Sequence, residues 1–119
     1  MKEEIIKTVI DGEKSIKNSD NTINKLIVRK RNLEEAIETF ESEDIPVPES
    51  AYGLLDWIKS EINRETKIQK ALINAIENLK FQYNLTLEDK ANYISSHGGH
   101  YTWVNNGHLV DDDGIVFED

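Results

Sequence analysis

Apolar residues recur with helical spacing over residues 48–83, and this is the clearest pattern in the chain. Turning each residue by about 100° brings the apolar side chains into one stripe roughly 160° wide. The stripe contains Ala51, Leu54, Leu55, Ile58, Ile62, Ile68, Leu72, Ala75, Ile76, Leu79 and Tyr83. Pro48 suits the first turn of a helix, where its missing N–H is no loss. The pattern therefore predicts a long amphipathic helix that begins near Pro48 and is on the order of 50 Å long.

A second amphipathic helix is predicted over residues 22–42. Its apolar face contains Ile23, Leu26, Leu33, Ile37 and Phe40. Two prolines within residues 43–48 end it, because proline cannot continue a helix. A link this short between two amphipathic helices predicts an antiparallel helical hairpin.

Two charged residues interrupt the apolar stripes of this hairpin. Lys30 lies in the stripe of residues 22–42, and Glu65 lies in that of residues 48–83. With the turn near Ile45–Pro46, the two side chains fall on neighbouring turns. We therefore predict that Lys30 pairs with Glu65 across the hairpin, with Glu61 as the alternative partner.

The N-terminal segment, residues 2–17, fits two structures. The apolar spacing between Ile5 and Ile10 favours a short helix, whereas Asp11-Gly12 would suit the turn of a hairpin. We expect the helix, followed by a polar connector at residues 18–21. Because the helix over residues 22–42 would be the shorter one, residues 68–83 need a further cover. The N-terminal segment can supply some of it, and we expect a homodimer to supply the rest.

A β pattern is confined to the C-terminal region. Residues 101–104 and 108–110 predict two strands joined by a turn at residues 105–107, and residues 115–117 predict a third. Trp103 and Phe117 are the expected anchors of this meander. Upstream, Thr86 and Asp89 have the spacing of a capping box, which predicts a short helix that Gly98 and Gly99 end.

The predicted fold class is therefore α+β, mainly α: a long antiparallel helical hairpin with a small C-terminal β-hairpin or meander. We expect one domain over residues 1–119. Its helical part spans residues 1–84, and residues 85–119 form a short helix plus an acidic β-meander.

The net charge is −9, and residues 85–119 account for −6 of it, with seven acids and one base. Such a surface disfavours nucleic acid and anionic membranes, so we expect neither as a direct partner. A host protein with a basic surface would suit it. The chain has no cysteine, no secretory signal pattern and no apolar run long enough for a membrane span, so a cytoplasmic location is expected.

The candidate chemistry lies in one polar corner of the C-terminal region. Partner- or ligand-binding residues are predicted to be His97, His100, Tyr101, Trp103, Asn105, His108, Asp111, Asp112 and Asp113. The aromatic faces and hydrogen-bonding edges among them would suit a nucleotide-like ligand. The alternative is zinc or another divalent transition metal held by His97, His100 and His108, in a metal- or His-dependent phosphodiester hydrolase. No catalytic triad, phosphate-binding loop or dinucleotide fingerprint is present, so no cofactor is expected.

The chain is short and acidic, and its composition is free of cysteine and rich in Ile, Lys, Asn and Glu. In this it is similar to small phage and mobile-element proteins, many of which inhibit host machinery. We therefore expect a non-enzymatic, oligomeric binding protein of the inhibitor or anti-defence type. It would block or sequester a host component, a protein or a nucleotide-like signal, through the acidic C-terminal region.

Overall fold

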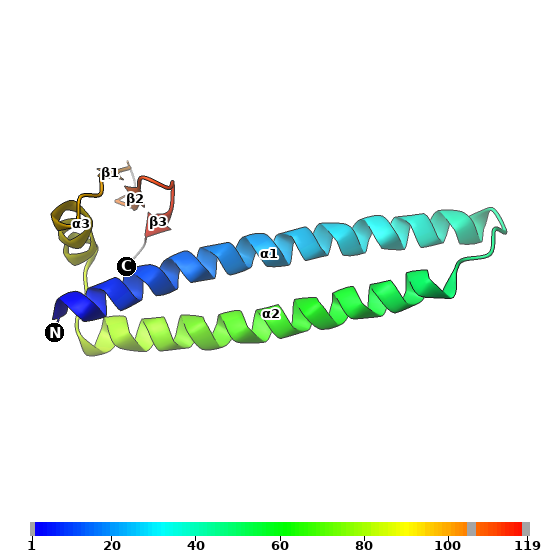
Figure 1. The fold of residues 1–119 in the computed structure, drawn as a ribbon, viewed down its shortest axis with the longest axis horizontal. Coiled ribbons are helices and arrows are strands. Elements are labelled where there is room, and N and C mark those ends of the chain that lie inside the picture. The colour runs from blue at the N-terminus through cyan, green and yellow to red at the C-terminus, as the bar shows by residue number, and fades with distance from the viewer. Residues whose placement is uncertain (1, 105–106, 118–119) are drawn as a thin grey trace. The chain divides into compact units, whose positions relative to one another are not determined.

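The computed structural model describes residues 2–104 and 107–117. Three helices precede three short strands (Figure 1). Their bounds are α1 Lys2–Ser42, α2 Glu49–Gln82, α3 Leu87–Ser96, β1 Tyr101–Trp103, β2 Leu109–Asp111 and β3 Val116–Phe117. The predicted α+β, mainly α class is confirmed.

Helix α1 is one helix of 41 residues, which differs from the sequence prediction. The polar connector predicted at residues 18–21 is helical, and so are residues 2–17, where the helix alternative was preferred. Residues that favour helix caps stay in the helix here because tertiary contacts engage them; the Asp20 carboxylate, for example, accepts a hydrogen bond from Gln69 of α2. Consequently α1 is longer than the 34-residue α2, the reverse of the predicted order.

Contacts within the chain divide it into two units. Unit 1 comprises Met1–Lys17 and Ala71–Asp119, and unit 2 comprises Asn18–Lys70. The boundary falls inside both long helices rather than near residue 84, because the ends of α1 and α2 pack with the C-terminal elements. The single domain expected from the sequence stays a prediction.

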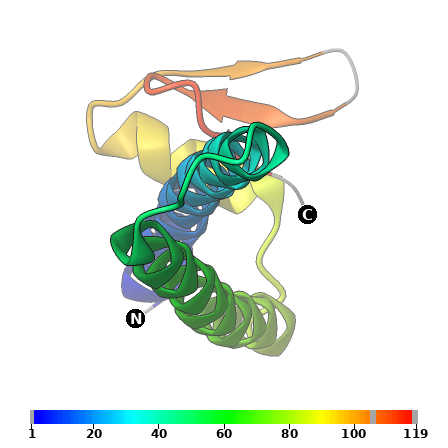
Figure 2. The ribbon, with the colours of Figure 1, turned by 90° about the vertical axis from the view of Figure 1, so that its right-hand side faces the viewer.

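Unit 1 is built around the N-terminal segment of α1, residues 2–17. Figure 1 shows this segment between the last turns of α2 and a layer formed by α3 and the strands, and Figure 2 shows α3 and the strands on the same side of α1. The buried core contains Ile6, Val9, Ile10, Ile76, Leu85, Leu87, Ala91, Leu109 and Phe117. The elements of unit 1 therefore cover Ile76, part of the stretch that the N-terminal segment and a second copy had been expected to cover together.

The three strands form an antiparallel sheet in the order β1-β2-β3. Trp103 lies opposite Leu109, and Leu109 lies opposite Phe117, so the three side chains share one face. Phe117 and Leu109 are fully buried, which confirms Phe117 as an anchor. Trp103 is 46% exposed, so its predicted role as an anchor is wrong. The helices cover Leu109 and Phe117 on this face, whereas the side chains of the edge strand β1 stay exposed.

All three helices end in the same backbone motif. After α3, Gly98 has φ of +78°, and the Gly99 N–H donates to the Ile94 carbonyl. Asp44 and Asn84 hold the equivalent left-handed positions after α1 and α2. This pattern satisfies carbonyls that a helix end would leave unpaired. The predicted stop of α3 and the Thr86–Asp89 capping box at its start are both confirmed.

Unit 2 is a helical hairpin. Residues 18–42 of α1 and residues 49–70 of α2 lie side by side and run in opposite directions, joined by the turn at residues 43–48 (Figure 1). The predicted reversal of the chain near Pro46 and Pro48 is therefore present.

Candidate protein-binding groove

The histidines of the C-terminal corner are engaged with neighbouring parts of unit 1. The His97 ring stacks on Tyr93 with 4.0 Å between ring centroids, and its Nε2 lies 3.1 Å from Glu3 Oε1. The backbone N–H of His100 donates to Asp112 Oδ2. Within the described part of the chain, no group of three or more His, Asp or Glu side chains is arranged to hold a metal ion.

The aspartates of the same corner shape the turn between β2 and β3. Asp111 Oδ1 accepts hydrogen bonds from the N–H groups of Asp113 and Ile115. The other oxygen, Oδ2, lies 3.3 Å from Lys14 Nζ of α1. Asp111 and Asp112 thus stabilise the local fold, while the Asp113 side chain is largely exposed and lies 4.0 Å from the same lysine.

The other predicted site residues lie on or beside β1 and β2. Tyr101 and Trp103 meet edge to face with 6.2 Å between ring centroids, and both are exposed. His108 is partly buried just before β2. Asn105 lies outside the described residues. The structure therefore brings the aromatic pair together, but it commits much of the polar corner to contacts within unit 1.

The most buried charge of unit 1 was not predicted from the sequence. Lys90 of α3 is 1% exposed, and its Nζ lies 2.6 Å from Glu13 Oε1 of α1. The same Nζ lies 5.7 Å from the centre of the Phe117 ring. The pair joins α1, α3 and β3. One signal was available in the sequence, because Lys90 follows Leu87 by three residues and so falls on the apolar face of α3.

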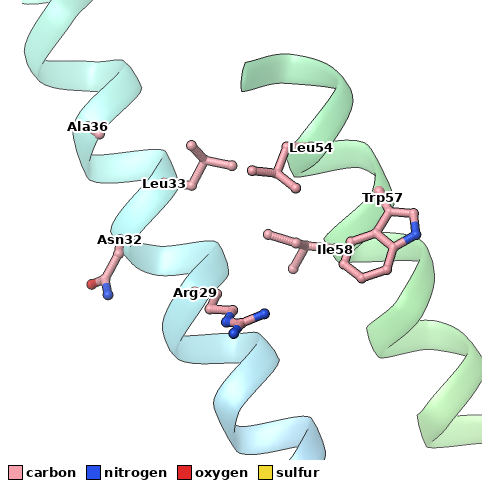
Figure 3. A pocket seen from close by; sticks show the side chains of 7 residues that line it. All are labelled: Arg29, Asn32, Leu33, Ala36, Leu54, Trp57 and Ile58. Carbon is pink, nitrogen blue, oxygen red and sulfur yellow. The ribbon is translucent and has the colours of Figure 1, made fainter. Parts of the chain in front are cut away.

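Unit 2 carries an open apolar groove of about 450 Å³ between its two helices (Figure 3). Its lining comes from both helices: Arg29, Asn32, Leu33 and Ala36 of α1, and Leu54, Trp57 and Ile58 of α2. Ile58 is buried, whereas Leu54 and Trp57 are 50% and 52% exposed. A buried aliphatic residue thus lies beside large apolar side chains that remain accessible to water.

The groove has polar groups on its α1 side. Figure 3 shows the Arg29 side chain extending from α1 towards α2, while the Asn32 side chain points away from α2. No ion pair of Arg29 occurs among the interactions of the described residues. A cation beside an apolar wall is suited to a helix that combines an apolar stripe with an acidic side chain.

Helical spacing explains why these apolar residues stay exposed. Two helices share one narrow seam, and Leu54, which is turned about 40° around the helix axis from the buried Ile58, is only half-covered by it. Trp57 was not included in the stripe predicted from the sequence, although it lies at the margin of that stripe, in line with Ile68, eleven residues or three turns later. The alignment of these two residues was the available signal that the apolar face of α2 is wider than one seam.

Charged residues on α2 continue this face between Trp57 and Ile68. Arg64 Nη2 donates to Glu61 Oε2 at 2.9 Å and to Glu65 Oε1 at 3.1 Å. The hydrogen bond from the Arg64 guanidinium holds the pKa of Glu61 below its usual value, and the same bond raises the pKa of Arg64.

The predicted pair between Lys30 and Glu65 is not among the ion pairs of unit 2. Lys30 Nζ lies 3.8 Å from Glu34 Oε1, one turn along the same helix, and Glu65 pairs with Arg64. Partners three or four residues away are always within reach on a helix surface, whereas a partner on another helix requires a matching register. Across the hairpin, Lys30 shares a hollow with Lys59, a residue of the same charge, rather than with an acidic residue.

The charge of unit 2 changes sign along the hairpin. Residues 34–56, around the turn, contain eight acids and no Lys or Arg, which gives −8. The stem, residues 18–31 together with 59–70, contains eight bases and three acids, which gives +5. The groove lies at the boundary between these two zones.

No family model, curated protein or solved structure matches this chain. In the described part of the chain, no helix has the length and apolar content needed to cross a membrane. The site itself thus defines the class of surface: an accessible apolar groove on a helical hairpin, flanked by opposite charges.

Proposed function

We propose that this protein is a non-enzymatic protein-binding module that receives an amphipathic α-helix in the groove of unit 2. One observation supports this most directly: Leu54 and Trp57 are half-exposed on the rim of a groove that contains the buried Ile58. Tryptophan and arginine are enriched among the residues that dominate binding energy at protein interfaces, and the groove has Trp57 and Arg29 together.

The charges around the groove specify the helix that it would bind. The ligand helix needs an apolar stripe for Leu54 and Trp57 and an acidic side chain within reach of Arg29. Basic residues at the end nearest the hairpin turn would meet the −8 zone. The host protein with a basic surface that was predicted from the sequence would therefore meet the acidic turn of unit 2 rather than the C-terminal meander.

Three further predictions from the sequence are proposals of the same kind. They are the blocking or sequestering of a host component, the cytoplasmic location and the association of the chain with itself. The groove supports a protein partner better than a nucleotide-like one, because most of its lining is apolar.

Trp57 fluorescence tests the proposal directly. With Trp103→Phe as the background, Trp57 is the only tryptophan left in the chain. The probe is a synthetic helical peptide with a leucine stripe, flanking Glu and Lys, and no aromatic residue, titrated into 0.5 µM protein. We expect a saturable blue shift of the Trp57 emission, because the indole leaves water.

Two variants distinguish binding in the groove from nonspecific hydrophobic binding of the peptide. Leu54→Ala should weaken peptide binding at least about tenfold, because it removes a rim anchor. Ile27→Ala is the matched control, since Ile27 is an exposed apolar residue of unit 2 that does not line the groove. An unshifted emission, or an equal loss in both variants, would count against the proposal.

A further inference from the structure

We infer that the helices received by the groove belong to a second copy of this chain, docked antiparallel so that two hairpins form a four-helix bundle. The inference rests on the proposed binding function and names the partner. It follows from the surplus of exposed apolar residues, the extent of the exposed face and the distribution of charge in unit 2.

Unit 2 leaves more large apolar side chains exposed than it buries. Three apolar residues of unit 2 are buried: Leu26, Ile37 and Ile58. Apart from Ile27, which lines none of the hollows on the grooved face, seven large apolar residues of the same unit are exposed: Val28, Phe40, Ile45, Tyr52, Leu54, Trp57 and Ile68. A pair of helices can close only one seam, whereas four helices enclose a central core. A second hairpin would supply the two missing helices.

The exposed face is continuous along the hairpin. The groove shares Arg29 with a neighbouring hollow of about 410 Å³ next to Val28. It also shares Leu33 and Ala36 with a hollow of about 170 Å³ that reaches Phe40 and the hairpin turn. The face of unit 2 is about 40 Å long and about 20 Å wide by helix geometry. Its area of roughly 800 Å² per copy is the size of a stable protein interface.

The charge distribution selects the antiparallel arrangement. Leu33 and Ile58 lie nine residues from the turn-side ends of their helices, which is about 14 Å, and twelve or more residues from the other end of unit 2. A two-fold axis through the groove would therefore bring the −8 turn of each copy over the +5 stem of the other. A parallel arrangement would place the two −8 zones together.

The antiparallel arrangement also completes the groove. A two-fold axis at this level places the Trp57 side chain of each copy against the groove of the other. Each copy would thus supply the tryptophan that the other copy needs to close its apolar floor over Ile58. Arg29 of each copy would face the partner's acidic zone.

Sedimentation and spin-label distances test the inference on the full chain. The chain contains no cysteine, so a single introduced cysteine carries the label at one site. We use Asn32→Cys at the groove and Glu43→Cys at the turn. The antiparallel dimer predicts a short distance between the two labels at residue 32, under about 20 Å, and a distance on the order of 30 Å or more between those at residue 43.

The salt dependence of the dimer tests the charge pairing, and the Trp57→Ala variant tests the apolar contact. Sedimentation equilibrium from 1 to 200 µM should show a dimer in 50 mM NaCl whose dissociation constant rises at least tenfold in 500 mM NaCl, because salt screens the charge pairing. Trp57→Ala should weaken the dimer at least tenfold, while Ile27→Ala should leave it unchanged. Far-ultraviolet circular dichroism confirms that each variant keeps its helices.

A monomer at 200 µM would overturn the inference, as would short distances at both label sites. The proposed function can be separated from it, because sedimentation at 0.5 µM, the protein concentration of the peptide titration, establishes whether the chain is monomeric when the peptide is added. If the chain is monomeric and its Trp57 emission still responds to the peptide, the inference of a second copy is overturned and the proposed helix-binding function is not. A Trp57 emission that responds neither to the peptide nor to protein concentration would overturn both.

Discussion

The two units of this chain use the same pair of helices in different ways. In unit 1, the ends of α1 and α2 are covered by α3 and the sheet, and a cluster of nine residues is buried. In unit 2, the same helices have only each other, and the rim of their shared groove stays half-exposed. The difference shows that one amphipathic hairpin forms a buried core where a further layer covers it, and keeps large apolar side chains accessible to water where no further layer of the described residues does.

The charged residues of the two units also differ in where they lie. Unit 1 has a lysine that is almost fully buried against Glu13 and the Phe117 ring, which fixes how α3 packs on α1. Unit 2 instead has zones of opposite charge, −8 around the turn and +5 in the stem, which under the proposed function would guide association rather than folding. Substitutions in unit 1 should therefore change stability, and those in unit 2 should mainly change binding.

The largest expected contrast is between a core residue and a groove residue. Phe117→Ala should lower the free energy of unfolding by about 3–5 kcal/mol, because it leaves a cavity where the ring is fully buried. Leu54→Ala should cost less than about 1 kcal/mol in the monomer, since the side chain is already half in water. Urea unfolding at low protein concentration measures both, and equal costs would remove the distinction between the units.

The next contrast compares two ion pairs with the same separation. Lys90 Nζ to Glu13 Oε1 and Lys7 Nζ to Asp11 Oδ2 are both 2.6 Å, but only the first is buried. Lys90→Met should cost about 3 kcal/mol, because it leaves the Glu13 carboxylate without its partner in a low-dielectric site. Lys7→Met should cost less than about 1 kcal/mol.

A double variant shows whether the buried pair itself causes the loss. Adding Glu13→Leu to Lys90→Met should restore much of the stability, since the unpaired charge is gone. If the losses in unfolding free energy of the two single variants simply add in the double variant, the packing of the Lys90 side chain, and not its charge, stabilises α3 on α1.

A glycine-to-alanine substitution should have opposite signs in the two units. A Cβ at Gly12 would lie 2.8 Å from Ile76 Cγ1 and closer still to its Cδ1, whereas a Cβ at Gly53 would meet open space. Gly53→Ala should therefore stabilise α2 by about 1 kcal/mol through helix propensity. Gly12→Ala should destabilise by about 1–2 kcal/mol, because overpacking outweighs the same gain.

Thermal unfolding of both glycine variants, with Gly12→Ala/Ile76→Val as a rescue, measures this contrast. The shorter valine removes the nearest atom, so the rescue should recover at least half of the loss. Stabilisation by Gly12→Ala alone would show that α1 and α2 are not in close contact at this level.

The smallest expected effects are at the helix ends. Asp44, with φ of 54°, and Asn84, with φ of 51°, hold left-handed positions that glycine adopts without a steric penalty. Asp44→Gly in unit 2 and Asn84→Gly in unit 1 should each stabilise by about 0.5 kcal/mol, because the gain in the folded state exceeds the added entropy of the unfolded chain. Urea unfolding measures the gains, and a loss in either variant would mean that its side chain makes a contact worth more than the strain.

Much of the fold was predictable from local signals. The start of α2 near Pro48, the capping box at Thr86, the stop after Ser96 and the three-stranded meander all follow from residues whose preferences act over a few positions. The break expected near Asn18 is absent, because helix-cap preferences are worth only about 1 kcal/mol and tertiary contacts override them. Trp103 and Phe117 looked alike in the sequence, and only the cover over one end of the sheet distinguishes them.

The candidate site was harder to predict. The sequence drew attention to the polar C-terminal corner, where His97, Asp111 and Asp112 make contacts within unit 1. The groove of unit 2 arises instead from Leu33, Leu54 and Trp57, residues that are individually ordinary and far apart along the chain. Nothing in their types marks a site until two helices lie side by side and nothing covers one margin of the seam.

By itself, the amino-acid sequence determined α2, α3, the turn, the sheet and the reversal of charge along the hairpin, because each depends on periodicity or on a few neighbouring residues. The unbroken course of α1 through residues 18–21 depended on tertiary contacts. Only the tertiary structure decided which apolar residues are buried and which form the groove, and that Lys90 lies buried against Glu13. Those outcomes depend on which surfaces the chain brings together, and burial is a property of the surrounding elements rather than of the residue.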